Sequence, residues 1–178
     1  NEKNIKTDIL VEQNRAVGVL DGDIDPNILG YDLNNIIENY YQFKYLDEVL
    51  DNSAKKTYDF SIKTYPSNED YLVIKIVPFP ESQGVLSDFI IVYDSNKKII
   101  VELSSYVSSE RLQKYKESMF AIRKVYKLEF KNTFRLDGDV YYLANSKEVI
   151  GFEKRYKKKD RRIEVKNHMV ITDFDKQP

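Results

Sequence analysis

The chain has 178 residues, of which 42% are hydrophobic and 13% aromatic. This length and composition are typical of one globular domain and exclude a disordered chain. There is no cysteine and only one histidine, His168, so disulfides, sulfur-ligated zinc and multi-histidine metal sites are excluded. No run of about 18 apolar residues occurs, so the sequence predicts no transmembrane helix.

The charges separate along the chain. Residues 1–110 carry 10 Lys or Arg against 19 Asp or Glu, a net charge of −9, whereas residues 111–178 carry 18 against 10, a net charge of +8. The overall formal charge of −1 hides this asymmetry. Such a division points to a binding partner with a charged surface.

The first residues are polar and aperiodic, and residues 1–16 are expected to form a tail. The polar start at Asn1, without an initiator Met, predicts a mature product from which a signal segment has been removed. We therefore expect a bacterial protein that is secreted or located in the periplasm or cell envelope, with a cytoplasmic location as the alternative.

The stretch DGDIDPNILGYD (21–32) places carboxylates at alternate positions, which resembles the ligand spacing of a calcium loop. Pro26 stands where an EF-hand needs glycine, and Asp32 stands where it needs a bidentate glutamate. An acidic cap-and-turn loop is therefore the favoured interpretation, and we expect no metal and no cofactor. The weak metal candidates are Asp21, Asp23 and Asp25.

Apolar residues at three- and four-residue steps predict an amphipathic helix over 32–53, with Asp32 as its N-cap. The period then falls to two, which predicts antiparallel strands joined by short turns. These strands are expected at 57–64, 71–79, 88–94 and 98–104. The interval 32–104 thus reads as a helix packed on four strands.

Residues 105–171 begin with a second amphipathic helix, from Ser108 or Ser109 to about Arg123. Alternation returns at 125–131, and Asp137-Gly138 marks a turn before 139–145. Residues 148–156 and 161–171 are predicted to pair as a hairpin. Its alternation predicts that Arg155, Arg162 and His168 face away from the core, and that the following residues face it: Ile150, Phe152, Ile163, Val165 and Met169. The predicted fold class is α+β, an antiparallel sheet packed on two amphipathic helices, in a single domain covering residues 1–178.

The order of elements over 32–104, with Leu72-Val73-Ile74, Phe89-Ile90-Ile91-Val92 and the turn before Lys97-Lys98-Ile99, resembles bacterial cystatin-like or nuclear-transport-factor-like modules. Immunity proteins and small envelope lipoproteins include such folds. The resemblance covers about 70 residues and contains no diagnostic motif. It implies protein binding rather than catalysis, and it assigns no functional residue.

The densest charge lies in Glu153–Lys166, where eight of fourteen residues are basic. On the predicted hairpin these basic residues crowd one end, where they could bind an acidic protein surface, anionic lipid headgroups or nucleic acid, or simply form a solvated edge. Tyr156 offers a stacking ring to nucleic acid. The candidate binding residues are Lys154, Arg155, Tyr156, Lys157, Lys158, Lys159, Arg161 and Arg162.

We interpret the chain as a non-catalytic secreted or periplasmic binding protein, of inhibitor or immunity-like type, with a protein partner. A pI near 6.0 disfavours nucleic acid, so a nucleic-acid-binding module using residues 148–171 is the first alternative. A hydrolase using carboxylates and His168 is the second, because a lone histidine can serve as a general base. No nucleophile motif and no glycine-rich phosphate loop accompanies His168.

Overall fold

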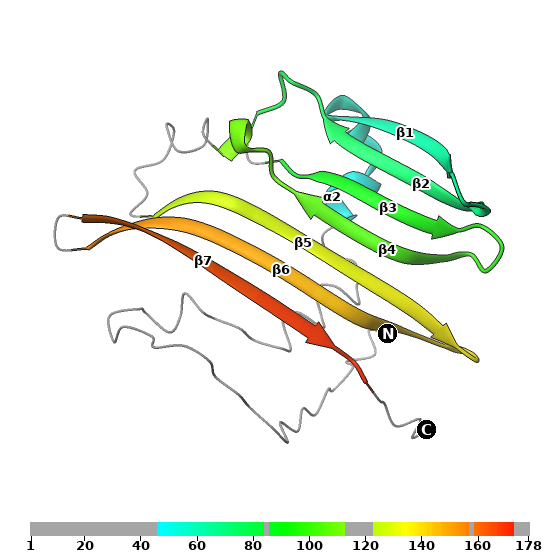
Figure 1. The fold of residues 1–178 in the computed structure, drawn as a ribbon. Coiled ribbons are helices and arrows are strands. Elements are labelled where there is room, and N and C mark those ends of the chain that lie inside the picture. Colours follow the sequence, from blue (N-terminus) through cyan, green and yellow to red (C-terminus); the bar gives the residue numbers. More distant parts are fainter. Residues whose placement is uncertain (1–45, 84–85, 113–122, 157–158, 173–178) are drawn as a thin grey trace, which may run out of the picture.

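The computed structural model describes residues 46–83, 86–112, 123–156 and 159–172. These residues form one antiparallel sheet in which the strands are ordered as they occur in the chain (Figure 1). Consecutive strands are neighbours throughout, as expected of short connections. The strands are β1 (Tyr58–Tyr65), β2 (Asn68–Pro78), β3 (Asp88–Asp94), β4 (Ile99–Tyr106), β5 (Arg123–Asp137), β6 (Val140–Tyr156) and β7 (Lys159–Val170).

The four strands predicted from the period-two pattern are confirmed as β1 to β4, with ends that differ by at most three residues. The predicted turn after β3 is also present. The Asp94 carboxylate accepts hydrogen bonds from the backbone nitrogens of Asn96 and Lys97 at 3.1 and 2.8 Å. Lys98 then adopts a positive φ of 57° and leads into β4. A side-chain cap of this kind is how Asp directs a tight turn.

The predicted helix over 32–53 is wrong where the structure describes it. Only α2 (Asp47–Leu50) is α-helical there, and a short 3-10 helix, η3 (Asn52–Lys56), follows it. The chain is extended at Asp51, with a ψ of 146°, and the Asp51 carboxylate accepts a hydrogen bond from Ser53 N at 2.7 Å. Asp51 is thus the N-cap of η3, and its extended backbone separates η3 from the end of α2. Residues 32–45 lie outside the described residues.

The second predicted helix is confirmed only at its first turn. Residues 109–112 are helical, and the Ser108 hydroxyl accepts a hydrogen bond from Arg111 N at 3.3 Å, as expected of an N-cap. Residues 113–122 lie outside the described residues. At Arg123, where the helix was expected to end, β5 has already begun.

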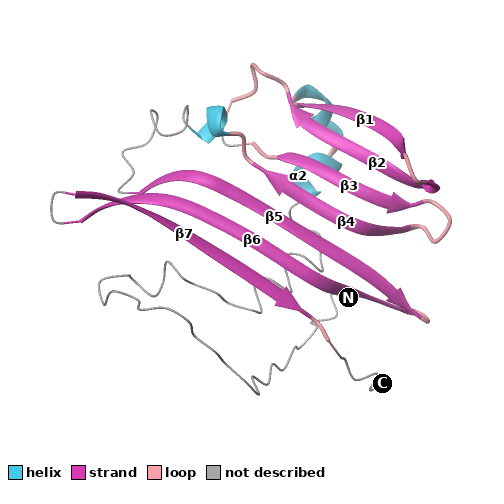
Figure 2. Ribbon diagram, in the orientation of Figure 1, coloured by secondary structure: helices cyan, strands magenta, loops and turns pink. Residues whose placement is uncertain are grey.

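The predicted fold class, α+β with a sheet packed on two amphipathic helices, is therefore wrong. The described chain is dominated by the sheet, and its helices are single turns (Figure 2). The long helix required by a cystatin-like architecture is not present among residues 46–83, 86–112, 123–156 and 159–172, so that architecture is not supported. The dominant local signal is the alternation of Val, Ile, Tyr and Phe, which pack across neighbouring strands.

The hydrophobic core lies on one face of the sheet, here called the core face. Three residues from the helical segment pack on this face: Leu46 just before α2, Val49 within α2 and Ala54 of η3. Leu103 of β4 and Leu143 of β6 are almost fully buried, with 0% and 1% of their surface exposed. The remaining buried members of this cluster are Tyr58, Ile76, Phe89, Ile91 and Phe134.

The last three strands are longer than the others and extend past β4, which pairs with β5 only from Glu102 to Tyr106. Gly138, with a φ of +60°, forms the turn between β5 and β6, as the Asp137-Gly138 signal predicted. The predicted break between 145 and 148 is wrong, because β6 runs without interruption to Tyr156. Strands β5 to β7 therefore form one three-stranded arm (Figure 1).

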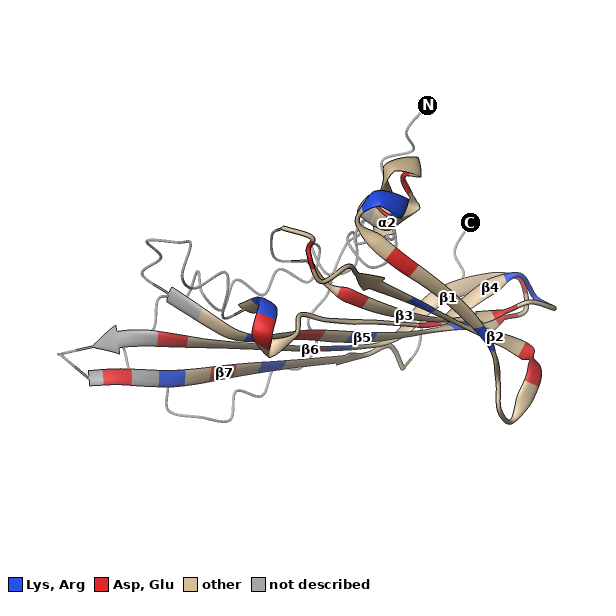
Figure 3. Cartoon of the chain, turned by 90° about the horizontal axis from the view of Figure 1, so that it is seen from above, with Lys and Arg blue, Asp and Glu red and all other residues tan. Residues whose placement is uncertain are grey.

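The face of this arm opposite the core carries alternating charges and is here called the charged face. Its described members include Lys127, Glu129 and Lys131 of β5 together with Arg162, Glu164 and Lys166 of β7. Both signs recur along the strands when the sheet is viewed from above (Figure 3). A strand that buries one side and solvates the other alternates in this way.

Candidate functional site

The predicted hairpin between residues 148–156 and 161–171 is confirmed. Strands β6 and β7 pair from Asn145 opposite Val170 to Tyr156 opposite Lys159 without a register shift. The predicted faces are also confirmed for the described side chains. Arg162 and His168 are exposed, whereas the residues predicted to face the core are buried or half-buried. The latter are Ile150, Phe152, Ile163, Val165 and Met169.

The sheet register brings three basic residues side by side at the end of the arm. Arg123 of β5 is opposite Lys154 of β6, and Lys154 is in turn opposite Arg161 of β7. We call these three positions the basic row. Directly opposite residues in an antiparallel pair have Cβ atoms about 4.5–5.5 Å apart, and like charges in such pairs are destabilising. The register therefore places three basic positions together at one end of the arm.

Several predicted binding residues fall at this end of the arm. Arg155 is opposite Asp160, and Tyr156 is opposite Lys159. Lys157 and Lys158 lie outside the described residues. The side chains of residues 123, 154–156, 159 and 161 also lie outside what the structure describes, so the sheet register alone places them.

Arg162 occupies the next row, and its side chain is described. Its Nε donates to Oε1 of Glu153 at 3.0 Å, and its guanidinium carbon lies 5.3 Å from the centre of the Tyr126 ring. The Arg162 side chain is 75% exposed. Exposed ion pairs and cation–π contacts each contribute about 1 kcal/mol or less. Arg162 thus keeps most of its charge available to solvent or to a partner.

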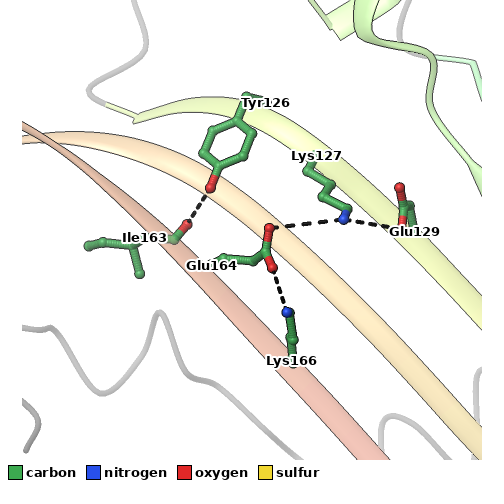
Figure 4. A network of polar contacts seen from close by, with 6 residues as sticks. All are labelled: Tyr126, Lys127, Glu129, Ile163, Glu164 and Lys166. Atoms are coloured by element: carbon green, nitrogen blue, oxygen red, sulfur yellow. Dashed lines mark hydrogen bonds and ion pairs between the residues drawn. The ribbon is translucent and has the colours of Figure 1, made fainter.

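A chain of ion pairs crosses the middle of the charged face (Figure 4). Lys127 Nζ lies 3.5 Å from Glu129 and 3.9 Å from Glu164, and Lys166 Nζ lies 3.0 Å from the other oxygen of Glu164. The hydrogen bond from Lys166 holds the pKa of Glu164 below its usual value, with a smaller contribution from the charge of Lys127. Here two lysines and two glutamates balance each other.

Two shallow pockets open on the sheet away from the helical turns. The first, of about 370 Å³, lies over β4 to β6 and is lined by Tyr106, Glu129, Lys131 and Val149 among others. The second, of about 470 Å³, is lined by Tyr65, Tyr71, Asn68 and Glu102. Tyr65 and Tyr71 meet edge to face at 6.3 Å between ring centres. Both pockets combine a few polar groups with aromatic or aliphatic surface, which suits contact with a polar partner surface.

His168, the candidate of the hydrolase interpretation, is exposed on β7. Asn145 Nδ2 lies 3.1 Å from His168 Nε2. No carboxylate contact to the ring is found among the described residues. The structure therefore does not bring His168 together with an acid that would orient it as a general base.

The aspartates proposed as weak calcium ligands, Asp21, Asp23 and Asp25, lie outside the described residues. Within the part of the chain that the structure describes, no group of three or more His, Asp or Glu side chains could hold a metal ion. In the same part, no helix is long and apolar enough to cross a membrane.

Sequence reasoning missed a polar cluster at the start of β3. Asp88 is 8% exposed, and the hydroxyl of Tyr106, its cross-strand partner, hydrogen-bonds to its carboxylate. Burial raises the pKa of Asp88 in spite of this bond and the charge of Arg111. Arg111 donates to the carbonyl oxygens of Pro78 and Phe79 at 2.9 and 3.0 Å, which ties the start of the second helical turn to the end of β2. This cluster fixes strand ends, and only the pairing of β3 with β4 could have revealed it.

Comparisons of the chain with protein-family models, with curated proteins and with solved structures find no match.

Proposed function

We propose that this protein is a non-catalytic binding protein whose basic row engages an acidic surface on a protein partner. The observation that carries the proposal is the register that aligns Arg123, Lys154 and Arg161 across three strands. Like charges in direct opposition destabilise a sheet unless a counter-charge is supplied. An acidic surface of a protein partner would supply such a counter-charge to all three positions.

The balance of charges elsewhere supports a protein partner. The ion pairs of Glu129, Lys127, Glu164 and Lys166 neutralise the middle of the charged face. The net charge of −9 over residues 1–110 would repel a long polyanion, whereas a compact acidic patch would meet only the end of the arm. Such polarity orients a protein partner and raises its association rate. We further propose a secreted or periplasmic location and an inhibitor or immunity-like role.

Nucleic acid is the second candidate, and one position favours it. Tyr156 lies opposite Lys159, two positions beyond Lys154 of the basic row. An aromatic ring beside a row of cations is the combination that stacks bases and neutralises phosphates. The two candidates therefore share a location and differ in the partner.

The experiment is a capture of partners by the immobilised full chain from the envelope and secreted fractions of the source organism, with and without nuclease. The test variant is R123E/K154E/R161E. The matched control, K55E/K56E/K63E, makes the same change in net charge at exposed positions of η3 and β1. We expect one acidic protein to be retained by the wild type and the control but not by the test variant, with or without nuclease.

Two further measurements decide the outcome. The association rate of the captured protein should fall in the test variant, and added salt should shrink the difference. A gel-shift titration with generic duplex DNA at about 50 mM salt should show no shift by the wild type. Retention that is lost with nuclease, or a salt-sensitive DNA shift abolished by the test variant, would instead establish the nucleic-acid candidate. Equal loss of partner retention in the test and control variants would show that the basic row is not the binding site.

A further inference from the structure

Strand β7 (Lys159–Val170) is an edge of the sheet. It pairs with β6 on one side, and among the described residues no strand pairs with its other side. It contains neither proline nor glycine, and its pairing has no register shift. A long, regular edge presents unpaired N–H and C=O groups that can pair with another strand.

The register shows which backbone groups face outward. Ile171 N donates to Ala144 O at 3.0 Å, so odd-numbered residues of β7 direct their backbone groups towards β6. In an antiparallel ladder these groups alternate in direction, so the even-numbered residues direct theirs to the free edge. The outward residues within the strand are Asp160, Arg162, Glu164, Lys166, His168 and Val170.

The same outward residues alternate in charge. Reading from Asp160 to Lys166, the signs are negative, positive, negative and positive. Arg162 and Lys166 are 75% and 71% exposed. Charges of one sign would protect an edge strand against aggregation, because they repel the identical edge strand of another copy. Alternating signs are instead self-complementary when two copies run antiparallel.

The charge pattern favours the register that pairs all four charged residues with opposite charges. A two-fold axis through Ile163 places Arg162 opposite the second copy's Glu164 and Asp160 opposite the second copy's Lys166. An axis one residue further, at Glu164, places Glu164 opposite itself and Arg162 opposite Lys166. An axis at Arg162 places Arg162 opposite itself. A two-fold axis at Val165 would match only Glu164 with Lys166. Opposite-charge cross-strand pairs contribute about 0.2–1 kcal/mol each, whereas like-charge pairs are unfavourable.

We propose that a second copy of this chain pairs antiparallel along β7, with the two-fold axis at Ile163, to give one continuous sheet. On the core face the axis brings Ile163, which is half-buried, against its own copy. On the charged face Arg162 keeps its bond to Glu153, because a guanidinium has five N–H donors and one of them, Nε, makes that bond. The occupant of the edge is thus identified by the charge order and the outward backbone groups.

The absence of cysteine allows a direct test of the register. Ile163 directs its backbone groups towards β6, so across the axis it forms a non-hydrogen-bonded pair with Cα atoms about 4.5 Å apart, within the range of about 4.4–6.8 Å for a disulfide. We expect Ile163→Cys to cross-link into a covalent dimer under mild oxidation, and Val165→Cys to remain monomeric. Ile62→Cys on β1, which is 64% exposed, controls for random collision.

Charge variants test the same pairing without oxidation. Glu164→Arg places like charges opposite each other twice, and we expect it to weaken dimerisation at least about tenfold in sedimentation equilibrium up to about 100 µM. The double variant R162E/E164R restores opposite charges across the axis and should recover the dimer, although it breaks the bond from Arg162 to Glu153. Circular dichroism of each variant confirms that the sheet is retained.

The outcomes are decisive. A monomeric wild type over this concentration range overturns the proposal. Equal cross-linking of Ile163→Cys, Val165→Cys and Ile62→Cys indicates collision and also overturns it. Cross-linking of Val165→Cys alone rejects the axis at Ile163. The proposal is supported if Glu164→Arg loses the dimer and R162E/E164R recovers it. If Glu164 had only a structural role within one chain, then also breaking the ion pair of Arg162 with Glu153 would not restore the dimer.

Discussion

Gly151 of β6 lies directly beneath the ring of Tyr126 of β5. A Cβ atom on Gly151 would stand 2.6 Å from Cε2 of Tyr126 and 2.9 Å from Cβ of Lys127. The ring extends over this glycine so that the Tyr126 hydroxyl donates to the Ile163 carbonyl oxygen of β7, at 3.4 Å (Figure 4). The register shift of β5 between Val125 and Lys127 places Tyr126 in this position. One side chain thus links all three strands of the arm.

Replacing Gly151 by Ala should therefore destabilise the arm. The added methyl group displaces the Tyr126 ring and presses on Lys127, and overpacking of this kind costs about 1–3 kcal/mol. In a Tyr126→Ala background the same change should cost less, because part of the clash is removed. Urea unfolding measures both. Gly138→Asn is the control, because its φ of +60° suits Asn and its surroundings are open. Equal costs in both backgrounds would show that Tyr126 does not cover Gly151.

Replacing Leu103 by Ala should be the most damaging simple truncation in β4. Leu103 is fully buried in the core cluster, and removing its side chain leaves a cavity that costs about 3–5 kcal/mol. Ile62→Ala, at a position that is 64% exposed on β1, should change the free energy of unfolding by less than about 1 kcal/mol. Similar losses for the two variants would show that the Leu103 side chain is not packed more tightly than the exposed Ile62 side chain.

Replacing Asn132 by Leu should stabilise the protein. Asn132 is fully buried on β5, and neither its amide nitrogen nor its amide oxygen has a hydrogen-bond partner in the described chain. An apolar side chain of similar size removes that desolvation penalty, a gain of about 1–2 kcal/mol in thermal or urea unfolding. Ser146→Ala at the cross-strand partner is the matched control. A loss of stability in Asn132→Leu would reveal that a bound group satisfies the amide.

Replacing Asp88 by Asn should stabilise the protein at neutral pH and less so in acid. Burial raises the pKa of Asp88 above its usual value, so the native state holds this proton more tightly than the unfolded chain does. Stability from this group therefore falls as the pH rises from the unfolded pKa of about 3.8 through the higher native pKa. Asn removes the penalty and still accepts the hydrogen bond from Tyr106.

The measurement for Asp88→Asn is urea unfolding at about pH 7 and about pH 4, with the exposed Asp59→Asn as the control. The gain at neutral pH should lie within about 1 kcal/mol, the usual range of a polar substitution, and should shrink at the lower pH. A gain that grows in acid would contradict the direction of the pKa shift.

The sequence by itself determined the strands, because alternation of apolar and polar residues is a local signal that survives without tertiary context. It placed β1 to β4, the turns at Asp94 and Gly138 and the faces of the β6–β7 hairpin. It also held a signal for the Tyr126 contact, since a glycine inside a strand pattern often marks close approach of another group.

Only the tertiary structure decided the rest. Of the helices expected over 32–53 and 108–123, the described residues keep only α2 and the turn at 109–112, because the cap at Asp51 and the pairing of Arg123 with Lys154 set the conformation beyond them. The basic row depends on partners more than thirty residues apart, Arg123 and Lys154. Which residues of β7 direct their backbone groups outward depends on the register of β7 with β6. These are facts of register between strands, and register is fixed by contacts that no local pattern contains.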